Sequence, residues 1–66
     1  MNREELRAEI ARKNVTRKHI AETLGLSATG LSLKLSGVNE FKESEIKALV
    51  SVLELTPADV NRIFLA

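Results

Sequence analysis

The 66-residue sequence contains no cysteine, tryptophan or tyrosine, one proline and two phenylalanines. Without cysteine it has neither a disulfide framework nor a thiolate metal site, so packing must supply its stability. It also lacks an apolar run long enough to span a membrane, and its charged start, NREELRAEI, is unlike a secretory signal. We therefore expect a single small cytoplasmic domain over residues 1–66.

Charge is small overall but unevenly placed along the chain. The formal net charge is +1. Residues 1–34 hold seven basic against four acidic side chains, a net +3, whereas residues 35–66 hold three against five, a net −2. Four cations lie within residues 12–18. Such a cluster is either a phosphate-binding patch or a solvated helix end.

Capping residues predict two short helices in the first 25 residues. Asn2 followed by Glu5 predicts a reciprocal cap for a helix that ends near Lys13. Asn14 suits a left-handed stop. After a buried Val15, a second helix is expected from the Thr16 cap to the Gly25 stop. The next helix is expected over residues 28–36, capped by Ser27 and ended by Gly37.

Two more helices are predicted in the second half. An apolar stripe with the spacing i, i+3, i+4 and i+7 indicates an amphipathic helix that faces a core, and its members are Ile46, Leu49, Val50 and Leu53. Thr56 at a cap and Pro57 at the first helical position then predict a short last helix. Its apolar residues are Val60, Ile63 and Phe64.

The stretch LSATGLSLKLSG, residues 26–37, carries two conflicting patterns. Leu31, Leu33 and Leu35 alternate with polar residues as in a strand, and Gly30 weakens a helix by about 1 kcal/mol relative to Ala. No other segment is extended, so a strand here would have no partner. We therefore predict a helix whose Leu31 and Leu35 face inward and whose Leu33 faces outward.

A tight glycine turn joins this helix to the preceding one. Ala21 is small enough to let the two helices approach, and Gly25 supplies a positive φ. Between them the expected apolar wedge consists of Ile20, Leu24, Leu26 and Leu31. This is the pattern of a helix-turn-helix, although an ordinary helical hairpin would use the same residue types.

The segment VTRKHIAETLGLSATGLSLKLSG, residues 15–37, resembles the Cro and lambda-repressor (XRE-type) family of phage and bacterial transcriptional regulators. FKESEIKALVSVLELTPADVNRIFL, residues 41–65, is similar to the second half of such domains, in particular those of short phage-encoded members. The resemblance implies an all-α, compact five-helix lambda-repressor-like DNA-binding domain with the helix-turn-helix at helices 2 and 3. It also implies a phage or prophage repressor that binds double-stranded operator DNA.

In that family the third helix enters the major groove, so its exposed residues become the expected base contacts. These are Ala28, Thr29, Ser32 and Leu33. None can form a bidentate hydrogen bond to a base, so we expect hydroxyl contacts, bridging water and apolar contact with thymine methyls. Gly30 would let the helix sit deep in the groove.

Phosphate contacts are expected around the start of the second helix and the ends of the third. Arg17 matches a phosphate-contacting position of the family. Lys34 replaces a large apolar residue of many members, and we expect its stem at the core edge and its ammonium reaching outward. The full expected set is Arg17, Lys18, Ser27, Lys34, Ser36 and Asn39. Lys42 and Glu40 depart from the family's cap and loop residues, which leaves contacts from that loop open.

The resemblance also implies a homodimer, at least on DNA. Val60, Phe64 and Leu65 are the candidate dimer contacts, although Val60 and Phe64 could instead close the core. His19 is the sole histidine and lacks partners at ligand spacing, so we expect no enzyme, metal, cofactor or small-molecule ligand. The alternative is a helix-turn-helix protein-interaction module such as an antirepressor or antitoxin, which the near-neutral charge favours.

Overall fold

The computed structural model describes residues 1–65, and all regular secondary structure in this part of the chain is helical, without a β-strand. The prediction of an all-α fold with five short helices is therefore confirmed. The last helix continues directly into a π-helical segment. The elements are α1 (Arg3–Lys13), α2 (Arg17–Leu24), α3 (Ala28–Ser36), α4 (Glu43–Val52), α5 (Pro57–Val60) and η1 (Asn61–Leu65).

Side-chain oxygens accept hydrogen bonds from the backbone at four helix starts, as the sequence predicts. The donor is in each case the amide three residues after the cap, which would otherwise lack a partner. The acceptor-to-nitrogen distances are 3.1 Å at Asn2, 3.1 Å at Thr16, 2.9 Å at Ser27 and 3.2 Å at Thr56.

The start of α1 differs from the prediction, and the start of α4 uses another kind of contact. The reciprocal half of the α1 cap is wrong, because the Glu5 carboxylate accepts from Arg62 and the Asn2 amide donates to the Ile63 carbonyl at 2.6 Å. At α4, the Glu45 carboxylate accepts from the Lys42 amide at 2.7 Å. Glu45 thus satisfies the amide of the cap residue Lys42, whose own ammonium has no acceptor for a helix amide.

Left-handed backbone ends the first three helices where the sequence predicts. Asn14 has φ 57° and ψ 37°, Gly25 has φ 72° and Gly37 has φ 95°. A β-carbon is strained in this region, so glycine is favoured at the two tight turns after α2 and α3.

One apolar core joins α1, α2, α3, α4 and η1. The apolar residues that are at most 1% exposed are Leu6, Ile20, Leu31, Leu35, Leu49, Leu53 and Ile63. The α4 stripe is confirmed, with Leu49 and Leu53 buried and its other members half-buried. Val15, expected to be buried, is half-buried against this core, as are Leu24 and Leu26. Each of the fully buried leucine and isoleucine side chains contributes about 2 kcal/mol.

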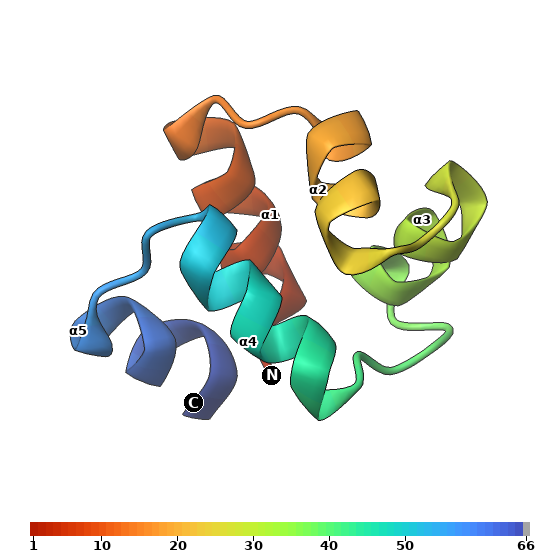
Figure 1. The fold of residues 1–66 in the computed structure, drawn as a ribbon. Helices are drawn as coiled ribbons and strands as arrows, with labels where there is room; N and C mark the ends of the chain where they lie inside the picture. The colour runs from red at the N-terminus through yellow and green to blue at the C-terminus, as the bar shows by residue number, and fades with distance from the viewer. Residues whose placement is uncertain (66) are drawn as a thin grey trace.

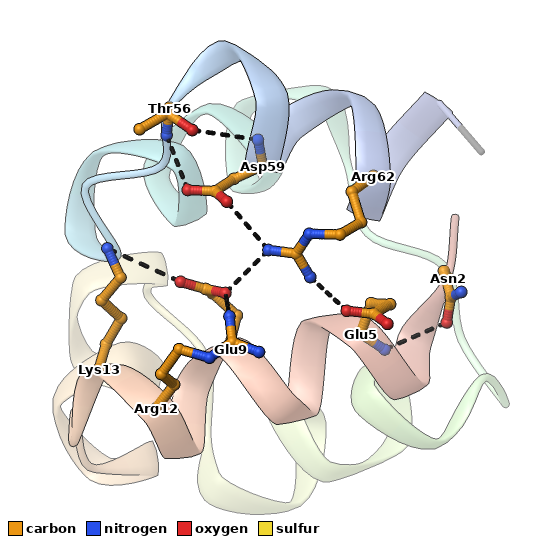
Figure 2. Close-up of polar contacts among 8 residues, drawn as sticks. All are labelled: Asn2, Glu5, Glu9, Arg12, Lys13, Thr56, Asp59 and Arg62. Atoms are coloured by element: carbon orange, nitrogen blue, oxygen red, sulfur yellow. Dashed lines mark hydrogen bonds and ion pairs between the residues drawn. The ribbon is translucent and has the colours of Figure 1, made fainter.

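An ion-pair network ties η1 and α5 to α1 (Figure 2). The Arg62 guanidinium contacts Glu5, Glu9 at 2.9 Å and Asp59 at 3.0 Å. Glu9, only 1% exposed, also pairs with Arg12 and with Lys13 at 3.7 Å. The network therefore fixes the C-terminal segment on the first helix.

The hairpin of α2 and α3 and the C-terminal segment lie on different sides of the molecule. In Figure 1, α1 and α4 occupy the middle, α2 and α3 lie at the right, and α5 lies at the lower left, with both chain ends at the bottom. The α2–α3 side and the C-terminal segment are therefore well separated. No helix within residues 1–65 combines the length and the apolar composition that crossing a bilayer requires.

Candidate functional site

The α2–α3 hairpin is closed by a three-residue turn. The Leu26 amide donates to the Ala21 carbonyl at 2.8 Å and the Gly25 amide donates to the Glu22 carbonyl at 3.2 Å, a Schellman motif. Ser27 then caps α3. Ala21 is 4% exposed, which agrees with its expected role of letting the two helices pack closely.

One face of α3 is directed to solvent, as predicted. Thr29, Ser32 and Leu33 are exposed, and Leu33 keeps 37% of its surface despite being a large apolar residue. Leu31 and Leu35 are each 1% exposed and hold the opposite face to the core. The alternation of leucines therefore belongs to a helix with one leucine facing outward.

Ala28 opens onto a hollow between α2 and α3. The hollow has a volume of about 380 Å³. Its wall is mostly apolar with charged groups from α2, and the lining residues are Arg17, Lys18, Ala21, Glu22, Leu26, Ala28 and Leu31.

The N-terminus of α2 is basic and exposed. Arg17, Lys18 and His19 are all exposed, and the first turn contains no acidic residue. Neither Arg17 nor Lys18 forms an ion pair with any residue of 1–65. The first turn of α3 likewise contains no acid, whereas those of α1, α4 and α5 do. The positive ends of α2 and α3 are thus left without an internal counter-charge.

The remaining polar residues predicted to contact phosphate lie at the two ends of α3. Ser27 is exposed and uses its oxygen to cap the helix. Ser36 is exposed and donates its hydroxyl to the Leu33 carbonyl at 3.0 Å. Asn39 is exposed in the following loop, where its amide donates to the same carbonyl at 3.2 Å.

The expectation that Lys34 reaches outward is wrong. Lys34 is 9% exposed, and its ammonium lies 2.5 Å from the Glu45 carboxylate of α4. The hydrogen bonds from Lys34 and from the Lys42 amide hold the pKa of Glu45 below its ordinary value. An ammonium that is bound to a buried carboxylate is not available to a phosphate, so Lys34 leaves the candidate site.

Three residues near α3 were not predicted from the sequence to lie there. Arg3 and Arg7 of α1 donate to the Lys34 and Leu35 carbonyls at 3.0 and 2.6 Å, which satisfies the end of α3. Val38 follows α3 and is 71% exposed. No sequence pattern indicated the contacts of the two arginines, because their partners depend on the tertiary packing. The exposure of Val38 could have been predicted, since Val38 belongs to no apolar helical stripe that packs into the core.

The C-terminal residues named as candidate dimer contacts differ in exposure. Val60 is half-buried, and Phe64 is half-buried against the core. Leu65 is 74% exposed. Ile63 is fully buried, so the segment closes the core and still leaves one large apolar side chain outside it.

The model of a family described as "Protein of unknown function (DUF739)" matches residues 2–66. This match covers nearly the whole chain, so the protein belongs to that family. No curated protein and no solved structure matches the chain.

Proposed function

We propose that this protein is a sequence-specific regulator that binds double-stranded DNA through a helix-turn-helix formed by α2 and α3. In this proposal the five helices have the lambda-repressor-like arrangement that the sequence resemblance implies. Helix α3 enters the major groove, whose width admits one α-helix. The bound protein regulates transcription of the genes that are controlled by the operator it occupies.

The observation that carries the proposal is the pairing of two features on one side of the molecule. The solvent face of α3 presents short side chains and Leu33, and beside it the start of α2 presents Arg17 and Lys18 without internal ion-pair partners in the described chain. Phosphate contacts position a protein on DNA and base-edge contacts specify the sequence. In this proposal the start of α2 supplies the phosphate contacts, and the solvent face of α3 supplies the base contacts.

Base readout in this proposal uses hydroxyl and methyl groups. The Thr29 and Ser32 hydroxyls can hydrogen-bond base edges, while Ala28, Leu33 and the Thr29 methyl group suit thymine methyls. Their exposure in the structure supports this assignment. Because Ala28, Thr29 and Ser32 have short side chains, the α3 backbone must approach the bases closely, and Gly30 in the first turn of the helix favours such an approach.

Phosphate binding is assigned to the start of α2. Arg17 and Lys18 would contact the DNA backbone together with the partial positive charge of the helix end. Ser27, Ser36 and Asn39 lie at the two ends of α3 and would add weaker polar contacts to the backbone. A protein of this design owes much of its affinity to counterion release, so binding must weaken steeply with salt.

We assign the homodimer contact to the C-terminal segment. Leu65 is 74% exposed, and the half-buried Val60 and Phe64 belong to the same segment. This segment lies away from α3 in Figure 1, so a dimer formed there leaves both copies of α3 open to DNA. Replacing Leu65 with Glu should shift sedimentation toward the monomer if this contact forms in solution.

The test is selection of binding sites from a random duplex pool, followed by affinity measurements over a salt series. Arg17→Ala should lower the slope of log affinity against log salt by about 1 for each subunit bound. Lys47→Ala is the matched control, because Lys47 is 76% exposed on α4 and its loss changes net charge equally. An unchanged slope in Arg17→Ala would exclude the phosphate role.

The same pool tests base readout by Leu33. Leu33→Ala removes methyl contacts without changing charge, so the preferred base should change at one position of each half-site while the salt slope stays constant. Selection of the wild-type sequence by Leu33→Ala would contradict the contact.

A second candidate function is a protein-interaction module such as an antirepressor or antitoxin. The exposed face of α3 supports it, because it carries no Arg, Lys, Asn or Gln of the kind that often reads bases. This candidate predicts no enrichment of any duplex in the selection and little duplex affinity at low salt.

A further inference from the structure

The buried pair formed by Lys34 and Glu45 is the feature that DNA contact leaves unexplained. Lys34 occupies the inward face of α3 with Leu31 and Leu35, a position where an apolar side chain would ordinarily pack. The Lys34 and Glu45 side chains are 11% and 8% exposed. Among ion pairs within residues 1–65, this is the one whose two side chains are both nearly buried.

A buried ion pair is a poor source of stability. Removing two charges from water costs about as much as their attraction returns, and an apolar pair of similar shape often serves the fold equally well. The pair instead has a demanding geometry, because one Glu45 oxygen accepts from Lys34 at 2.5 Å and from the Lys42 amide at 2.7 Å. The acceptor is therefore fixed to the start of α4 while it holds α3.

The pair joins two helices whose backbones are not in close contact. In the described chain α3 packs closely against α1 and α2, and α4 packs closely against α2, but α3 and α4 are not a closely packed pair. Arg3 and Arg7 hold the end of α3 from the α1 side. Lys34 is the polar connection on the side of α4.

We propose that Lys34 and Glu45 are a positioning pair that sets the orientation of α3, and with it the sequence specificity of the site. This inference rests on the proposed DNA-binding function, since α3 is the reading helix only in that case. Both residues act through α3 and neither touches DNA. Loss of the pair should leave the protein folded but let α3 adopt more than one orientation.

The test variant is Lys34→Met combined with Glu45→Gln. Methionine keeps the length of the lysine stem, and glutamine keeps an oxygen for the Lys42 amide. The matched control is Lys47→Met with Glu43→Gln, which makes the same changes in a pair on α4 whose side chains are 76% and 86% exposed. Thermal unfolding of both variants should stay cooperative. Lys34→Arg, which keeps the charge, provides a second comparison.

Two measurements follow. The first is the affinity for the selected duplex relative to a scrambled duplex at fixed salt. We expect this ratio to fall about tenfold in the test variant, to remain constant in the control, and to be largely restored in Lys34→Arg. The second is amide hydrogen exchange of residues 31–36, which should become at least tenfold faster in the test variant than in the control.

The outcomes separate this inference from the proposed function. If the wild type does not discriminate between duplexes, the proposed function fails, and exchange at residues 31–36 still decides whether the pair holds α3. Exchange equal to the control overturns the positioning role in every case. Faster exchange with unchanged discrimination overturns the specificity role and leaves the pair a structural contact only.

Discussion

The two sides of the molecule use their charges differently. Next to α1, Arg62 contacts carboxylates of α1 and α5, and Glu9 is shared by cations from α1 and η1 (Figure 2). At the start of α2, Arg17 and Lys18 are exposed, and within residues 1–65 they form no ion pair. The first set of charges holds the chain together, whereas the second contributes little to the fold.

This difference has a consequence for mutagenesis. Charges that are satisfied internally should affect stability when they are removed, and unpaired surface cations should affect binding alone, because exposed charges contribute little to folding. The net charge of +1 does not reveal this division, because it sums the paired charges near α1 and the unpaired cations at the start of α2.

Glu9→Gln should lower the free energy of unfolding by about 2 kcal/mol, measured by urea denaturation. The Glu9 side chain is 2% exposed and its loss of charge leaves Arg12, Lys13 and Arg62 without their common carboxylate. Glu4→Gln is the control, because Glu4 is an exposed acid of the same helix. Equal midpoints for the two variants would show that the network does not stabilise the fold.

Features that depend on neighbours in sequence were predictable. The caps at Thr16 and Ser27 and the left-handed stops at Asn14 and Gly25 each need only three to five adjacent residues. The outward position of Leu33 followed from helical periodicity once a strand had been excluded. The all-helical fold and the exposure of the candidate face were therefore accessible from the sequence.

Features that depend on distant residues were not. Lys34 and Glu45 are eleven positions apart, and Arg62 meets Glu5 across 57 positions. A lysine on an otherwise apolar face is compatible with an outward ammonium or with a buried partner, and the sequence does not state which carboxylate lies near it. The same reason explains why the predicted reciprocal cap at α1 is wrong. The Glu5 carboxylate accepts a hydrogen bond from Arg62, which lies at the other end of the chain.

Asp59 gives the network a dependence on pH. Hydrogen bonds from Thr56 and then from Arg62 lower the pKa of Asp59 from 3.8 to about 2. A lowered pKa in the folded state stabilises above the unfolded value, so this contribution is present above about pH 4 and is lost as pH falls to about 2. Asp59→Asn should flatten the fall in Tm over that range.

The control for Asp59→Asn is Glu40→Gln, because Glu40 is exposed in the loop before α4 and has no ion pair in the described residues. It should retain the wild-type dependence of Tm on pH. Parallel curves for Asp59→Asn and the wild type would mean that the carboxylate is not selectively stabilised in the folded state.

The smallest effect on stability is expected at Gly30, on the side with unpaired charges. Alanine gains about 1 kcal/mol of helix propensity, but its Cβ would lie 3.1 Å from the Ser27 oxygen that caps α3. Weakening the cap costs a similar amount, so the two effects should cancel to within about 0.5 kcal/mol. Gly30→Ala thus tests α3 without unfolding it.

Binding should respond to Gly30→Ala although stability does not. If the α3 backbone approaches the bases closely, the added methyl group should lower affinity for the selected duplex at least fivefold at constant salt. Ser51→Ala is the control, because Ser51 is an exposed residue of α4 and its replacement should leave binding unchanged. Wild-type affinity in Gly30→Ala would show that the α3 backbone does not approach the bases closely. The short side chains of Ala28, Thr29 and Ser32 would then be too far from the bases to contact them.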